Sequence, residues 1–146
     1  MQTPTSTNYS SETKPCDFSG KHILIADDEP INMMVISKML IARKATVSKA
    51  VNGHEVLEML KDGLKPDLIL LDIKMPELDG YMTIEQIKQQ YPEFTVLAFT
   101  ASFLDEEAEQ LLIGKGFYGS LSKSFKPDAF YERITDALES NLGAAI

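Results

Sequence analysis

The chain has 146 residues, of which 44% are hydrophobic and 25% charged, and its formal net charge is -8. This size and composition predict one ordinary globular domain, large enough for a normal hydrophobic core. The negative charge argues against nucleic acid as a partner, because phosphates require a basic surface.

No apolar run approaches the roughly 20 residues of a membrane span, and the N-terminus lacks the apolar region of a signal peptide. We therefore expect a cytoplasmic protein without direct membrane contact, unless the chain comes from a larger membrane-bound protein. Cys16 is the only cysteine, so the sequence excludes an internal disulfide and a metal cluster built on cysteines.

Residues 1–20 are rich in Ser, Thr and Pro and contain almost no apolar side chains. Such a segment cannot bury enough surface to offset the entropy lost on ordering, so we predict a disordered tail or linker. The folded domain is expected at residues 21–142.

From Lys21 onward, short apolar strands alternate with amphipathic helices. Strands are predicted at residues 22–26, 45–51, 68–71, 95–100 and 119–122, and the fourth and fifth helices at 102–115 and 127–142. Five strand–helix pairs with short connections predict an α/β fold with a parallel sheet covered on both faces. The length favours a flavodoxin-like doubly wound (βα)5 sandwich with strand order 2-1-3-4-5.

The first helix begins at Pro30, a residue suited to a first helical turn. Its apolar stripe is predicted at Ile31, Met34, Val35 and Met39. Met33 lies off that stripe, and it either fills the core or belongs to an apolar docking surface for a partner helix.

The third strand ends at Asp72, and Pro76 and Asp79-Gly80 then break the strand and turn the chain into a helix. An acid at the carboxyl end of a central parallel strand lies where open α/β sheets bind their ligands. Asp72 is therefore the candidate reactive group.

In the predicted strand order, Asp27 and Asp28 at the end of the first strand lie beside Asp72. Three neighbouring carboxylates repel one another, and a divalent cation with oxygen ligands, above all Mg²⁺, relieves that repulsion. The plainer interpretation of the same residues is a helix-capping Asp27 and a solvated loop acid at Asp72. Thr100 ends the fourth strand and Lys123 follows the fifth, on the same rim as the acids, and together they offer a hydroxyl and a cation to a phosphoryl group.

Four segments in this order and spacing resemble the response-regulator receiver family of two-component signalling over essentially all of residues 21–140. The matching segments are Ile25-Ala26-Asp27-Asp28-Glu29-Pro30-Ile31-Asn32, Leu71-Asp72-Ile73-Lys74-Met75-Pro76-Glu77-Leu78-Asp79-Gly80, Phe99-Thr100-Ala101 and Leu121-Ser122-Lys123.

The resemblance implies that Asp72 accepts a phosphoryl group from a phosphohistidine on a histidine kinase or a histidine phosphotransfer domain. It also implies that Asp28, Asp72 and the backbone carbonyl of Lys74 bind Mg²⁺, with Asp27 assisting through water. Lys123 would pair with the phosphorylated carboxylate and Thr100 would move to hydrogen-bond it. No enzymatic activity is expected beyond Mg²⁺-dependent self-phosphorylation and autodephosphorylation, and Lys74 and Ser102 are expected to influence the phosphorylated lifetime.

Two positions depart from the family pattern. Ser124 follows Lys123 where the family usually has a proline after an often cis bond, and we expect a trans bond here because cis before serine costs about 3–4 kcal/mol. Ser120 stands where the family commonly has an aromatic residue coupled to the threonine. Because a receiver that only relays its phosphoryl group needs less conformational readout, these departures favour a receiver of a hybrid histidine kinase or phosphorelay.

Three alternatives remain open at the level of sequence. The first is a receiver-like interaction module that works without phosphorylation. The second is a small magnesium-dependent hydrolase using Asp72, which is disfavoured because Lys74 stands where a second acid would protonate a leaving group. The third is a flavin-binding flavodoxin, which is disfavoured because the acidic loop after the first strand would repel phosphate.

Overall fold

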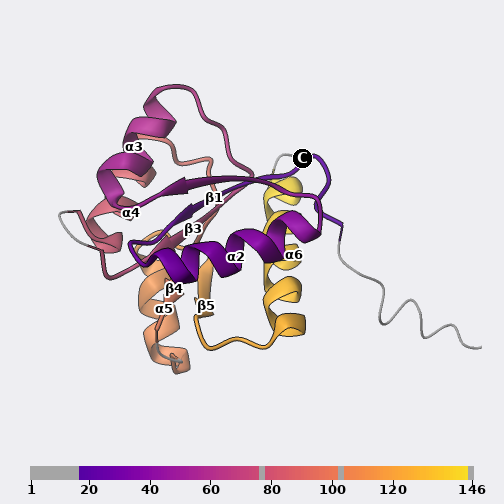
Figure 1. Ribbon diagram of the computed structural model, residues 1–146. Helices are drawn as coiled ribbons and strands as arrows, with labels where there is room; N and C mark the ends of the chain where they lie inside the picture. Colours follow the sequence, from indigo (N-terminus) through magenta and orange to yellow (C-terminus); the bar gives the residue numbers. More distant parts are fainter. Residues whose placement is uncertain (1–16, 76–77, 102–103, 145–146) are drawn as a thin grey trace, which may run out of the picture.

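The computed structural model describes residues 17–75, 78–101 and 104–144, and these form a central sheet between two layers of helices (Figure 1). The strands are β1 (His22–Ala26), β2 (Thr46–Ala50), β3 (Leu68–Asp72), β4 (Val96–Thr100) and β5 (Gly119–Ser122). The helices are α2 (Pro30–Ala42), α3 (Gly53–Lys61), α4 (Gly80–Gln90), α5 (Glu106–Gly114) and α6 (Pro127–Ala144).

All four strand pairs of the sheet are parallel, and the strand order is β2-β1-β3-β4-β5. This confirms the predicted doubly wound fold. The order places β1 next to β3, with Ala26 opposite Leu71. The residues that follow these two strands therefore meet at one edge of the sheet.

Each face of the sheet carries its own hydrophobic core, because successive strand side chains point to opposite faces. On one face Ile23, Ile25 and Leu70 pack with residues of α2 and α6, and on the other Leu24, Ala26 and Leu71 pack with residues of α3, α4 and α5. β3 and β4 are buried along their whole length. Their continuous apolar sequences are those of strands covered on both sides.

The predicted inner face of α2 is wrong at three of its four positions. Ile31, Met34 and Val35 are 72%, 49% and 43% exposed, and of the predicted stripe Met39 alone packs against the core. The buried positions of the helix are Met33, Ile36, Ser37 and Leu40. Apolar residues occur all around α2, so its periodicity selects no single face, and the packing against β1 and β2 decides which one is buried.

The apolar spacing of the sequence also predicts that Tyr81 and Leu111 face inward, and the structure corrects both assignments. Tyr81 is 42% exposed and Leu111 is 65% exposed, whereas the buried positions of α4 and α5 include Ile84, Ile87 and Leu112. Both misplaced residues lie about one residue from the true inner stripe. A helix of nine or eleven residues gives too few apolar positions to fix its orientation more closely.

The ends of the domain differ a little from the predicted bounds. Residues 1–16 lie outside the described part of the chain, so the disordered tail stays a prediction. Phe18, assigned to that tail, is 2% exposed and its ring centroid lies 6.3 Å from that of Tyr131. The packed domain therefore includes Phe18. Among the described helices, none is long and apolar enough to cross a membrane.

Candidate functional site

Two buried carboxylates lie close together at the carboxyl ends of the neighbouring strands β1 and β3. Asp27 directly follows β1, and its amide donates a hydrogen bond to the carbonyl of Ala50 over 3.0 Å. Asp72 is the last residue of β3. Asp27 and Asp72 are 1% and 4% exposed, whereas Asp28 is exposed. Carboxylate oxygens of these three acids lie within 4.8 Å of one another, as the sequence predicts.

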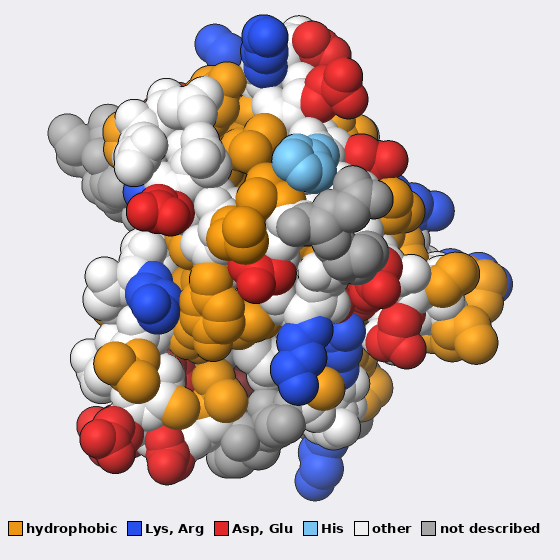
Figure 2. All heavy atoms as spheres, turned by 90° about the vertical axis from the view of Figure 1, so that its left-hand side faces the viewer, with side chains coloured by type: hydrophobic (Ala, Val, Ile, Leu, Met, Phe, Trp, Pro, Cys, Tyr) orange, Lys and Arg blue, Asp and Glu red, His pale blue; other side chains and the backbone are white. Residues whose placement is uncertain are grey.

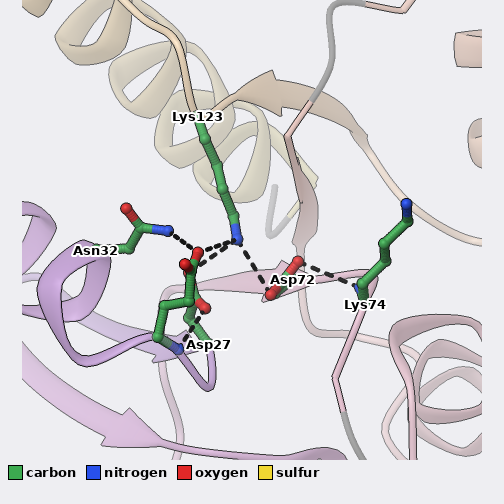
Figure 3. A network of polar contacts seen from close by, with 6 residues as sticks. Asp27, Asn32, Asp72, Lys74 and Lys123 are labelled. Atoms are coloured by element: carbon green, nitrogen blue, oxygen red, sulfur yellow. Dashed lines mark hydrogen bonds and ion pairs between the residues drawn. The ribbon is translucent and has the colours of Figure 1, made fainter.

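Lys123 reaches from the end of β5 to the acids (Figure 3). Its Nζ lies 3.1 Å from Asp72 Oδ2 and 3.2 Å from Asp27 Oδ2. The Lys123 amide also donates a hydrogen bond of 2.6 Å to the carbonyl of Thr100, which fixes the start of the loop after β5. Among the described residues no peptide bond is cis, so the bond before Ser124 is trans, as predicted.

The electrostatics of the site follow from burial and from like charges. Burial and the neighbouring charge of Asp27 raise the pKa of Asp72 to about 6, although the hydrogen bond from Lys123 lowers it. Burial lowers the pKa of Lys123, but contact with Asp72 and Asp27 outweighs burial, so its pKa lies above the ordinary value. The site therefore holds more negative charge than its single lysine neutralises.

A small divalent cation fits this cluster. The donors are all carboxylate oxygens, the set that Mg²⁺ prefers. Asp27 Oδ2 is buried and makes no hydrogen bond, although Lys123 lies within ion-pair distance of it. A metal ligand bond would satisfy that oxygen, and the exposed Asp28 leaves the cluster open to solvent.

A pocket of about 470 Å³ opens beside the acids and is lined in part by Asp72, Thr100 and Lys123. The other predicted site residues lie around this pocket. Thr100 is 7% exposed. The Lys74 amide donates a hydrogen bond of 3.2 Å to Asp72 Oδ1, and its ammonium points away from the acid (Figure 3). The proposed metal-binding role of the Lys74 carbonyl stays a prediction, and Ser102 lies outside the described residues.

Gly80 allows α4 to begin directly against the end of β3. A Cβ atom on Gly80 would lie 2.7 Å from the backbone oxygen of Asp72, a separation that forces a shift. The amide of Gly80 also donates a hydrogen bond of 2.9 Å to the carbonyl of Ile73. The predicted turn at Asp79-Gly80 thus helps to hold Asp72 in position.

Ser120 takes part in a polar network instead of providing the aromatic side chain that is common in the family. Its hydroxyl donates a hydrogen bond of 3.0 Å to Glu109 of α5. Arg133 of α6 contacts Glu109 over 2.8 Å and donates through Nε to the Ser120 carbonyl over 3.1 Å. This network joins α5, β5 and α6 beside a second pocket of about 410 Å³, which Thr100 and Ser120 help to line.

Two site residues were not assigned from the sequence. The Glu29 carboxylate lies 3.6 Å from Lys123 Nζ, and Asn32 donates a hydrogen bond of 2.5 Å to the same Glu29 oxygen. The sequence did contain a signal, because Glu29 follows Asp28 directly and the spacing of three residues places Asn32 on the same helical face.

Comparison with known proteins agrees with this architecture. The family model named response regulator receiver domain matches residues 23–135. The chain is 31% identical over 84% of its length to a protein-glutamate methylesterase/protein-glutamine glutaminase of Methanosarcina mazei. It is 33% identical over 86% of its length to the alkaline phosphatase synthesis transcriptional regulatory protein PhoP of Bacillus subtilis. The chain spans 33% and 51% of the lengths of these two relatives.

Solved structures are similar over most of the chain. The receiver domain of sensor histidine kinase PA1611 from Pseudomonas aeruginosa, with magnesium coordinated in its active-site cleft, has a TM-score of 0.73 at 28% identity. The match covers 83% of this chain and 99% of that domain. The N-terminal domain of a response regulator/sensory box/GGDEF protein from Carboxydothermus hydrogenoformans has a TM-score of 0.75 at 29% identity, covering 86% and 100%.

The parallel sheet, with acids at the carboxyl ends of β1 and β3, defines a doubly wound α/β domain of the flavodoxin-like, receiver type. The chain belongs to the response regulator receiver domain family of two-component signalling.

Proposed function

We propose that this domain is a phosphoacceptor, with Asp72 taking a phosphoryl group from a phosphohistidine in a reaction that requires Mg²⁺. The observation that carries the proposal is the position of Asp72, which is 4% exposed, contacts Lys123 Nζ over 3.1 Å and lies close to the two acids that follow β1. The alternative of a module that works without phosphorylation is not favoured, because this constellation is intact.

In the proposed reaction a carboxylate oxygen of Asp72 forms a bond to phosphorus. The bond from phosphorus to the imidazole nitrogen of the donor breaks, and its electron pair stays on that nitrogen, which takes up a proton. Lys123 offsets charge on the phosphoryl oxygens, and the amide of Lys74 holds the Asp72 carboxylate in place. When bound at Asp27, Asp28 and Asp72, magnesium would supply the remaining neutralisation.

We infer that the phosphoryl donor is a helical phosphotransfer domain or the equivalent domain of a histidine kinase. Ile31, Met34 and Val35 support this, because these exposed apolar residues lie on the first turns of α2, beside the acids after β1. A helix of the donor packed there would bring its phosphohistidine close to Asp72. Nucleic acid is not supported, since the net charge is -8 and Lys and Arg form only small separate groups on the face drawn in Figure 2.

A receiver of a hybrid histidine kinase or phosphorelay is the more specific form of this proposal. It is supported by the likeness to a receiver domain of a sensor histidine kinase, and by Ser120, which replaces the usual aromatic with a hydrogen bond to Glu109. Exchange of the phosphoryl group with histidine phosphotransfer domains through Asp72 tests it. Transfer that is absent with such domains but rapid from a stand-alone kinase would count against it.

The phosphoacceptor proposal is tested by incubating wild type and Asp72→Asn with acetyl phosphate, with and without Mg²⁺, and measuring intact mass. Wild type should gain one phosphoryl group only with Mg²⁺, and Asp72→Asn should gain none. An equal gain in both proteins, or none in either, would refute the proposal.

A further inference from the structure

Glu29 is an exposed acid that shares Lys123 with the two buried carboxylates of the site. Its side chain is 64% exposed, and its Oε1 lies 3.6 Å from Lys123 Nζ. Glu29 is also the N-cap residue of α2, yet its side chain makes no capping hydrogen bond. The carboxylate therefore points toward the lysine instead of satisfying the free amides at the start of the helix.

Asn32 holds Glu29 in this position. Its Nδ2 donates a hydrogen bond of 2.5 Å to the same Glu29 oxygen that faces Lys123, and Figure 3 shows Asn32 directed toward this cluster. The Glu29 amide in turn donates a hydrogen bond of 2.9 Å to Asp27 Oδ1. Both the backbone and the side chain of Glu29 are thus fixed against the site.

The position of Glu29 affects any anion that approaches Asp72. Glu29 lines the open pocket together with Asp28, Thr100 and Lys123. An incoming phosphoryl group must pass this negative charge, and it must compete with the Glu29 carboxylate for Lys123. Both effects grow with the negative charge of the donor.

We propose that Glu29, held by Asn32, is a specificity-determining residue that selects phosphoryl donors by their charge. It disfavours highly charged small acyl phosphates relative to donors in which the phosphoryl group is bonded to a nitrogen that can be protonated. The inference rests on the proposed phosphoacceptor function, which it extends by a preference for the nitrogen-linked class of donor.

The test compares acetyl phosphate with phosphoramidate, whose protonated nitrogen offsets part of its charge. Rate constants for the gain of one phosphoryl group are measured by intact mass at saturating Mg²⁺. Glu29→Gln should raise the acetyl phosphate rate constant by about two- to fivefold and the phosphoramidate rate constant by less, and the increase should shrink at high salt. The matched control is Glu139→Gln, which removes the same charge from an exposed position near the end of α6.

A second variant tests whether Asn32 acts through Glu29. Asn32→Ala should shift the ratio of the two rate constants in the same direction by a smaller factor, and it should have no effect in the Glu29→Gln background. A merely structural role of either residue would change both donors equally.

An unchanged donor ratio in Glu29→Gln, or the same shift in Glu139→Gln, would overturn the inference and leave the proposed function intact. If wild type gained no phosphoryl group from either donor, the proposed function would fail and the inference with it.

Discussion

Asp72 lies beside other acids, and its contact with Lys123 neutralises only part of the negative charge of this cluster. Burial and Asp27 raise its pKa to about 6 from an ordinary value of 3.8. Between these two pH values the folded protein binds more protons than the unfolded chain. Without metal, the contribution of Asp72 to stability is therefore greatest below about pH 4 and is lost as the pH rises through about 6.

The substitution Asp72→Asn should consequently stabilise the metal-free protein at pH 7 by about 1–3 kcal/mol. The neutral side chain removes a buried charge and its repulsion from Asp27, and the gain should disappear near pH 4, where Asp72 is protonated in the folded state. Urea unfolding in the presence of a chelator measures both values. A variant less stable than wild type at pH 7, or a gain that does not depend on pH, would contradict the proposed electrostatics.

The first residue of α4, Gly80, lies directly against the last residue of β3, Asp72. A Cβ on Gly80 would meet the backbone oxygen of Asp72 at 2.7 Å, so the turn between the two elements requires glycine for space. Nothing lies within 4 Å of a Cβ on Gly114 in α5. The two glycines therefore form a matched pair of helical positions, one crowded and one open.

Gly80→Ala should destabilise the domain by about 1–3 kcal/mol and weaken Mg²⁺ binding, because the backbone at Asp72 must shift. Gly114→Ala should be neutral or stabilising by up to about 1 kcal/mol, since alanine favours a helix. Chemical denaturation and calorimetric titration with Mg²⁺ measure the two effects. Equal stability and equal Mg²⁺ affinity in both variants would show that the close approach at Gly80 does not position Asp72.

The helices also show where prediction from sequence reaches its limit. Strands and turns depend on neighbouring residues, so the helix start at Pro30 and the turn into a helix at Asp79-Gly80 could be predicted. The inner face of α2 could not, because Ile31 and Met33 are both apolar and packing alone buries Met33. The contact of Arg133 with Glu109 joins residues 24 positions apart, and no local pattern reveals it.

At the scale of the whole molecule, the predicted topology was sufficient to bring the site together. Asp27, Asp72 and Lys123 lie at the carboxyl ends of β1, β3 and β5, and their meeting point followed from the order 2-1-3-4-5. The contact of Glu29 with Lys123 depends on the direction of one side chain at a helix start, which strand order does not determine.

The unneutralised acids predict that Mg²⁺ stabilises the whole domain. At a free concentration of about ten times Kd, Mg²⁺ should raise the free energy of unfolding by about 1.4 kcal/mol. Thermal unfolding measures the rise in Tm against NaCl of equal ionic strength, which controls for screening of the net charge of -8. Asp27→Asn should lose most of the Mg²⁺-dependent increase, and an undiminished increase in this variant would place the ion elsewhere.

The most direct test of the phosphoacceptor proposal is to locate the phosphoryl group. After reaction with a phosphoryl donor and Mg²⁺, borohydride reduces an aspartyl phosphate to homoserine, and tandem mass spectrometry identifies the modified position. We predict homoserine at residue 72 alone. Homoserine at Asp27 or Asp28, or a phosphoryl group on a serine, threonine or histidine with Asp72 unchanged, would contradict the proposal.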